Sequence, residues 1–221
     1  MIVAFDAARA GDLLMNDANR KAHWDTVYTT KGENEVSWFQ DNPAPSLELI
    51  DLARPTPESA IVDIGGGASR LVDSLVARGF NRVTVLDISE AALEAAKARL
   101  GERASLVQWI VADVTKWYPT QTFEVWHDRA AFHFLTDPVD RSAYVTRMKQ
   151  AIKLGGYVII GTFAIDGPEK CSGLPVNRYD AAGLAKELGE GFELLESRRH
   201  DHSTPWKSAQ RFLFCIFQRT A

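Results

Sequence analysis

Residues 62–70 read Val-Asp-Ile-Gly-Gly-Gly-Ala-Ser-Arg, and this stretch decides the fold. It lies between the apolar run 60–64 (AIVDI), typical of a buried strand, and residues 71–79, where apolar side chains repeat at helical spacing. Glycines at such a junction let the backbone turn tightly and approach a ligand closely. In an open α/β sheet, ligands bind outside the carboxyl ends of the strands. We therefore expect a ligand-binding loop here rather than a plain turn.

Strand and helix patterns alternate along the rest of the chain. Strands are predicted at residues 60–64, 82–86, 105–111, 123–127, 157–163, 192–197 and 211–218, and helices at 46–54, 71–79, 89–100, 138–154 (ended by Gly155-Gly156) and 180–188. Such alternation implies right-handed crossovers and a mainly parallel sheet. The last two strands are joined without a long helix, so they should pair antiparallel. We expect an α/β fold, a three-layer sandwich around a doubly wound, mainly parallel seven-stranded sheet with an antiparallel last strand.

The first quarter of the chain differs in composition from the rest. Residues 1–58 contain Trp24, Tyr28 and Trp38, followed by four prolines between positions 43 and 57. Pro55 and Pro57 end the predicted helix 46–54 and separate it from the first strand. We expect a helical N-terminal extension over residues 1–58 and a ligand-binding domain over residues 59–221.

Composition excludes several classes of protein. Of the 221 residues, 46% are hydrophobic and 24% are charged, which excludes a mainly disordered chain. No run approaches the roughly 18 apolar residues of a membrane span, and the net charge of −4 argues against a nucleic-acid partner. Cys171 and Cys215 form no CxxC, so a zinc finger is excluded and no metal site is expected. The start lacks the features of a secretion signal, so we expect a cytoplasmic protein.

The glycine loop does not match a dinucleotide fingerprint. In G-x-G-x-x-G, counted from Gly65, the third glycine would fall at Arg70, where it would be needed for close helix–strand packing. Asp63 ends the strand two residues before Gly65, and we expect it to point into the crevice. An acid there suits a ligand with an ammonium group better than one with a pyrophosphate. These residues argue against a nucleotide-dependent oxidoreductase, the alternative from another class.

Two more acids follow the next two strands. Asp87 ends the strand 82–86, 22 residues after Gly65, where a carboxylate can accept hydrogen bonds from both ribose hydroxyls. Asp113 follows the strand 105–111 and can accept from an exocyclic amino group such as that of adenine. Alone, Asp87 would be a helix cap and Asp113 a solvated turn residue; with the glycine loop, they indicate a nucleoside site.

The order of Asp63, the Gly65 and Gly67 pair, Asp87 and Asp113 resembles the class I (seven-stranded Rossmann-like) S-adenosylmethionine-dependent methyltransferases. The resemblance runs from about residue 58 to the end of the chain. It implies S-adenosyl-L-methionine as cofactor, with the glycine loop beneath its methionine part and Asp87 on its ribose. It also implies that Asp113 holds the adenine amino group. Ile88 and Val114 would flank the adenine ring.

Two stretches resemble a branch of that superfamily. Residues 128–135 (DRAAFHFL) are similar to the DRGxFHxL element of the thiopurine- and thiol-methyltransferase-like group, with Ala130 in place of the usual glycine. Related DKG elements occur in some protein-lysine methyltransferases. Trp24, Tyr28 and Trp38 match an N-terminal lid in which a W-x-x-x-Y helix and a later tryptophan close over the methionine end. Packing of these aromatic residues against the domain is the alternative.

These features indicate the methyl acceptor less directly than they indicate the cofactor. We expect methyl transfer to a small-molecule nucleophile, a thiol or another soft or anionic acceptor; protein-lysine methylation and a binding-only domain are the alternatives. Asp128 and His133 are the candidate catalytic residues, Asp128 more as a positioning group than as a base, and His127 should lie in or beside the sheet. In the long loop 166–179, Cys171 either has a lowered pKa beside Lys170 or is a small buried residue. We expect a monomer or weak homodimer.

Overall fold

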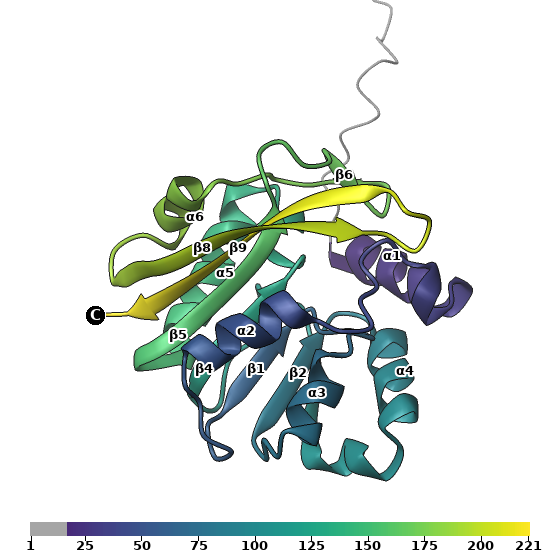
Figure 1. The fold of residues 1–221 in the computed structure, drawn as a ribbon, viewed down its shortest axis with the longest axis horizontal. Coiled ribbons are helices and arrows are strands. Elements are labelled where there is room, and N and C mark those ends of the chain that lie inside the picture. Colours follow the sequence, from purple (N-terminus) through teal and green to yellow (C-terminus); the bar gives the residue numbers. More distant parts are fainter. Residues whose placement is uncertain (1–16) are drawn as a thin grey trace, which may run out of the picture.

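The computed structural model describes residues 17–221, and its centre is one twisted sheet (Figure 1). The strand order is β3-β2-β1-β4-β5-β9-β8. The bounds are β1 Ile61–Ile64, β2 Val83–Asp87, β3 Val107–Val111, β4 Phe123–Arg129, β5 Ile152–Phe163, β8 Phe192–Ser203 and β9 Ala209–Arg219. The first five strands are parallel, and β9 is antiparallel to both β5 and β8. The predicted seven-stranded sheet with an antiparallel last strand is confirmed.

Helices cover both faces of the sheet and make the expected three layers (Figure 1). The helices are α1 Asp17–Thr30, α2 Ala44–Leu52, α3 Leu71–Ala77, α4 Glu90–Leu100, α5 Pro138–Ala151 and α6 Ala181–Leu188. Side chains of α2, α3 and α4 join one hydrophobic cluster, and those of α5 and α6 join the cluster on the opposite face. Helix α1 belongs to neither layer and lies against α4 (Figure 1). The expectation about a secretion signal concerns residues 1–16, which lie outside the described residues.

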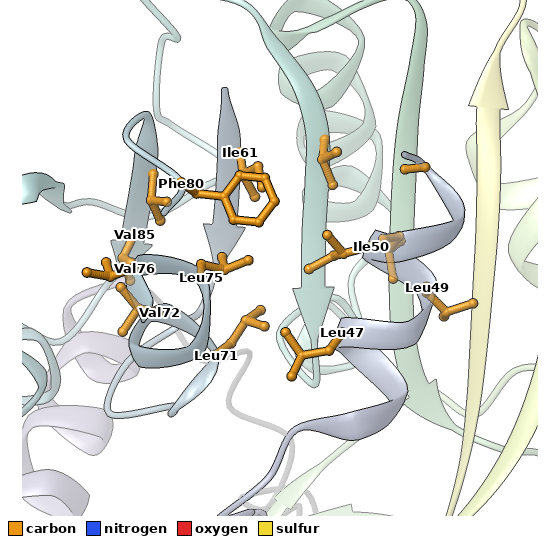
Figure 2. Close-up of a cluster of buried hydrophobic side chains, with 14 of the residues drawn as sticks. Leu47, Leu49, Ile50, Ile61, Leu71, Val72, Leu75, Val76, Phe80 and Val85 are labelled. Carbon is orange, nitrogen blue, oxygen red and sulfur yellow. The ribbon is translucent and has the colours of Figure 1, made fainter. Parts of the chain in front are cut away.

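Helix α2 belongs to the core although it precedes the glycine loop by more than ten residues. Leu49 and Ile50 are fully buried, and Leu47 is 6% exposed. They belong to the same hydrophobic cluster as Leu71 and Leu75 of α3, with α2 over β4 and β5 and α3 over β2 (Figure 2). Among the described residues of the predicted extension, 17–58, α1 and the segment up to α2 lie at the edge of the sheet, whereas α2 packs on its face.

Two boundaries differ from those expected. Helix α5 ends at Ala151 because Ile152 takes an extended conformation (φ −84°, ψ 135°) and pairs with Phe123 of β4. Gly155, at φ +76°, lies in the irregular start of β5 and does not end the helix. Burial of Ile152, 1% exposed, against the sheet outweighs the helical spacing that continues past it in the sequence.

The closing hairpin is longer than expected. Strand β8 reaches Ser203, where the prediction ended at residue 197, and its last residues pair with β9. His202 is 4% exposed, and its Nε2 lies 2.7 Å from the carbonyl oxygen of Ser37. The segment before α2 therefore contacts the end of this hairpin at His202, where Gln40 also lies 3.5 Å from Nδ1. Among residues 17–221, no helix has the length and apolar character that crossing a membrane requires.

Candidate functional site

The glycine loop leaves no space for side chains. Gly65 and Gly67 have φ values of +63° and +45°, in the left-handed region that favours glycine. A Cβ added to Gly65 would lie 2.6 Å from the Cβ of Ala131, and one added to Gly67 would lie 2.9 Å from the hydroxyl of Tyr28. The backbone N–H of Gly65 donates to Leu86 at 2.7 Å, which ties the loop to β2. The loop is therefore a backbone surface closely packed between β2, the β4 turn and α1.

A cavity of about 120 Å³ opens beside this loop. It lies at the carboxyl ends of β1, β2 and β4, under α1 and Trp38. Seven of the nine predicted cofactor residues line it: Trp24, Trp38, Gly65, Asp87, Ile88, Asp113 and Val114. Residues far apart in sequence thus meet at one cavity, where the sheet topology predicts a ligand.

Asp63 and Gly67, the other two predicted cofactor residues, do not line the cavity. Asp63 was expected to point into the crevice, but its side chain turns to β4, where its Oδ1 lies 2.7 Å from Nδ1 of His127. It is 2% exposed. A Cβ on Gly66 would lie 2.6 Å from its Oδ2, so the carboxylate lies directly behind the glycine loop.

Asp87 is buried at the end of β2 and receives backbone hydrogen bonds. The N–H of Ser89 donates to its Oδ1 at 2.8 Å, and the N–H of Gly67 also donates to its carboxylate. Burial, with smaller contributions from the nearby acids Asp63 and Asp25, raises the pKa of Asp87 to about 7. A ligand that donates hydrogen bonds would stabilise its ionised form.

Asp113 is engaged by protein groups on both oxygens. Its Oδ1 accepts from the backbone N–H and the hydroxyl of Thr115, at 2.8 and 2.7 Å. Its Oδ2 pairs with Arg20 of α1 at 3.1 Å, and Arg20 also pairs with Asp140 at 2.7 Å. Arg20 lines the cavity and was not predicted; it places a cation next to the acid that the sequence assigns to adenine.

Aromatic side chains of α1 and the following segment cover the cavity. The ring centroid of Trp24 lies 5.0 Å from that of Phe134 and 5.6 Å from that of Trp38. Tyr28 is 6.2 Å from Trp38, and burial raises its pKa well above the usual value. These aromatic residues line the cavity and also pack on one another. A role in covering the ligand and a role in packing are therefore compatible.

Neither predicted catalytic residue lies at the cavity. Asp128 is fully buried; its carboxylate accepts from the N–H groups of Ala131 and Phe132, at 3.0 and 3.1 Å, and from the hydroxyl of Tyr144 at 2.8 Å. Burial raises the pKa of Asp128 to about 6. The carboxylate therefore shapes the turn after β4 and does not contact the cavity.

His133 is fully buried as well. Its Nδ1 accepts from the N–H of Phe163 at 3.4 Å, and its ring stacks edge-on against Phe134. Burial, with a further effect of Arg129, lowers the pKa of His133 to about 3. A group so weakly basic and so enclosed does not meet the geometric requirement for a general base. Its expected role at the acceptor has no support in this geometry.

Arg129 was quoted within the sequence motif without being given a role, yet it lines the cavity. Its Nη1 donates to the carbonyl of Trp38 at 2.9 Å, and its guanidinium lies 5.3 Å from the ring centroid of Phe212. Its Nε and Nη2 are buried and have no hydrogen-bond partner in the part of the chain that the structure describes. Burial lowers the pKa of Arg129 to about 10, so it stays charged at neutral pH. Its position at the end of β4 was the available sequence signal.

Cys171 lines the cavity from the short strand β6 (Lys170–Cys171), which pairs with β7 (Leu174–Pro175). It is 4% exposed, and burial raises the pKa of its thiol to about 11. The idea that Lys170 lowers this pKa is wrong, because desolvation dominates. The alternative interpretation, a small buried residue, is confirmed.

Comparisons with known proteins agree with this site. Residues 61–156 match the family model described as methyltransferase domain. The solved structure of the N-methyltransferase NodS from Bradyrhizobium japonicum WM9 with S-adenosyl-L-homocysteine has a TM-score of 0.68 at 17% identity, covering 93% of this chain and 100% of that one. The 1,6-didemethyltoxoflavin-N1-methyltransferase of Burkholderia thailandensis gives 0.66 at 18% identity, covering 92% and 85%. A structure solved for the conversion of a disulfide bond into a thioacetal group during echinomycin biosynthesis gives 0.71 at 19% identity, covering 90% and 92%.

Curated proteins with similar sequences are matched over a smaller share of this chain than these solved structures are. The eEF1A lysine and N-terminal methyltransferase of Mus musculus is 27% identical over 52% of this chain, which spans only 16% of that protein. The EEF1A lysine methyltransferase 2 of Homo sapiens is 24% identical over 80% of this chain and 75% of that protein. The matched residues 61–156 include the glycine loop, and the sheet order agrees with the Rossmann-like methyltransferase fold. The chain is thus an enzyme whose cofactor is S-adenosyl-L-methionine.

Proposed function

We propose that this methyltransferase acts on a small molecule that is anionic or carries a soft nucleophile such as a thiolate, as in the thiopurine- and thiol-methyltransferase-like group. The observation that carries the proposal is Arg129, whose buried Nε and Nη2 lack a partner at the cavity wall among the described residues. Buried donors without partners are rare and costly, and an anion satisfies both. A structure similar in fold was solved for the conversion of a disulfide bond into a thioacetal group, which is chemistry at sulfur.

The residues at the cavity fit the cofactor. The loop at Gly65 and Gly67, which a Cβ would fill, would lie beneath the methionine part. Asp87 would accept from the ribose hydroxyls, and Asp113 from the adenine amino group, shared with Arg20. Ile88 and Val114 would flank the adenine, and Trp24 and Trp38 would cover the methionine end.

The cofactor supplies a methyl group already activated by the positive sulfur. The protein then has to hold the acceptor in line with the sulfur–methyl bond and keep water out, and orientation alone is worth up to roughly 7–11 kcal/mol. A thiolate or oxyanion acceptor needs no base. This agrees with the burial of Asp128 and His133 away from the cavity. Arg129 would bind and orient the anion, under the cover of Trp38.

Protein-lysine methylation is the second candidate, because the curated relatives carry that activity in their names. A lysine acceptor must lose a proton before it can attack. The charge of Arg129 at the cavity wall opposes a second cation there. These two features favour the small-molecule acceptor.

Incubating the enzyme with methyl-labelled S-adenosylmethionine and an extract, then separating products by size, tests the choice. We expect the label in small molecules and its loss in Arg129→Met, with partial recovery in Arg129→Lys. Binding of S-adenosylhomocysteine, measured in parallel, should change little in Arg129→Met. If that binding is lost instead, Arg129 holds the cofactor's carboxylate and not the acceptor. Label that migrates with protein would overturn the small-molecule proposal.

A further inference from the structure

Three buried polar side chains behind the glycine loop have no part in the site described so far. Ser46 of α2, His127 of β4 and Asp63 of β1 are 1%, 2% and 2% exposed. The Oγ of Ser46 lies 2.8 Å from Nε2 of His127, and Nδ1 of His127 lies 2.7 Å from Oδ1 of Asp63. Serine, histidine and aspartate in this order form the triad of many hydrolases. Here the serine is buried and does not line the cavity, so it cannot reach a substrate.

The hydrogen-bond roles in this chain are fixed by chemistry. An ionised carboxylate only accepts, so Nδ1 of His127 donates to Asp63. Nε2 of His127 pairs with the hydroxyl of Ser46, so both ring nitrogens are bonded and the ring is fixed in its orientation beside Asp63.

The position of Asp63 indicates which part of the ligand its charge would act on. Its Oδ2 lies where a side chain on Gly66 would begin, 2.6 Å from an added Cβ, so only the backbone of the loop separates it from the cavity side. The loop would carry the methionine part of the cofactor, whose ammonium group is positive. A buried negative charge behind the loop attracts that ammonium with little screening.

We propose that His127 and Ser46 are positioning residues for cofactor binding, which hold the carboxylate of Asp63 behind the glycine loop so that its charge attracts the aminoacyl end of the cofactor. This rests on the proposed role of the glycine loop. If His127 is replaced by an apolar residue, the buried carboxylate loses the donor that holds it behind the loop, and the attraction weakens. The adenosine end keeps its own contacts with Asp87 and its neighbours.

Calorimetry with two probes separates positioning from general damage. S-Adenosylhomocysteine carries the aminoacyl group, and 5′-methylthioadenosine lacks it. We expect His127→Leu to raise the Kd for S-adenosylhomocysteine about tenfold or more, the effect of losing a charge-assisted bond, with the Kd for methylthioadenosine within about twofold. His127→Asn, which retains an N–H donor near the position of Nδ1, should restore most of the binding.

Ser46→Ala keeps the contact between His127 and Asp63, and serves if His127→Leu does not fold. It should shift the same Kd by about threefold, again only for S-adenosylhomocysteine. Thr84→Val is the matched control, because Thr84 is 1% exposed, hydrogen-bonds Gln108 at 3.2 Å and has no link to the chain of three. Equal loss of both probes, or no loss of either, would overturn the proposal. Failure of the wild type to bind either probe would instead overturn the assignment of the cofactor loop.

Discussion

Asp87 combines burial with a ligand-binding role, and this makes cofactor binding sensitive to pH. In the structure, its pKa lies at about 7 because burial disfavours the charge. Two ribose hydroxyls can both donate only to the ionised carboxylate. Binding therefore has to remove a proton from Asp87 below pH 7, and it removes none well above that pH.

We predict that the Kd for S-adenosylhomocysteine rises as the pH falls from 8 to 6, approaching about tenfold per unit below the pKa. Asp87→Asn should weaken binding at pH 8 by about 1.5–3 kcal/mol and remove the slope. Calorimetry at pH 6, 7 and 8 measures both. A slope that persists in Asp87→Asn would assign the titration to another group, such as Asp128, whose pKa is about 6.

Ala130 occupies the position where the sequence motif usually has glycine. It has φ +65°, a left-handed conformation that costs an L-residue roughly 1–2 kcal/mol. Asp128 holds the turn in this shape through the N–H groups of Ala131 and Phe132. Glycine, usual at this position in the resembling families, adopts the conformation without that cost.

We therefore predict that Ala130→Gly stabilises the protein by up to about 1 kcal/mol, after allowing for the greater freedom of glycine in the unfolded chain. Urea denaturation measures it. Ala131→Gly is the matched control, because Ala131 has φ −102° and gains nothing from glycine, so it should destabilise. A loss of stability in Ala130→Gly would show that strain at this turn is negligible.

At the scale of elements, the sequence patterns predicted those residues whose positions depend on local chemistry. Gly65 and Gly67 were found because a tight approach needs glycine, and Asp87 because the residue ending β2 has a fixed place at the sheet edge. Asp63 was misplaced because its orientation depends on His127, 64 residues away in the chain. Arg129 was passed over because a sequence does not show which of its donors lack partners.

Helix α1 is the element whose position should depend on the cofactor. It is held by the pairs of Arg20 with Asp113 and Asp140, by a hydrogen bond of 2.8 Å between Asp25 and Ser89, and by Trp24 against Phe134. Most of its residues are partly exposed. Contacts of this kind give low local stability, so the helix can open without global unfolding.

We predict that S-adenosylhomocysteine slows hydrogen exchange over residues 23–39, because the bound ligand fills the cavity under Trp24 and Trp38. Strands β1 and β4 are the internal reference and should exchange slowly in both states. If residues 23–39 are equally protected with and without the ligand, the segment is fixed scaffold and its aromatic residues serve as core.

For the whole molecule, the remaining question is where the folding unit begins. The composition of residues 1–58 suggested one extension, yet α2 is within that range and supplies Leu49 and Ile50 to the core. Each such buried side chain is worth about 1.5–3 kcal/mol, and a domain has only about 5–15 kcal/mol in total. Losing α2 would also leave His127 without Ser46. The packing therefore favours a folding unit that starts at α2.

We predict that a chain starting at residue 43 folds cooperatively, whereas one starting at residue 59 does not. The chain starting at residue 43 lacks α1 and Trp38, but it should keep its sheet, because Leu47, Leu49 and Ile50 still cover it. It should also bind S-adenosylhomocysteine more weakly than the full chain, since the cover of the cavity is missing. Circular dichroism during urea unfolding, with the full chain as reference, measures the first point and calorimetry the second. Cooperative unfolding of the piece 59–221 with the midpoint of the full chain would contradict this, and would mean that α2 is part of the extension and that the sheet domain begins at its first strand.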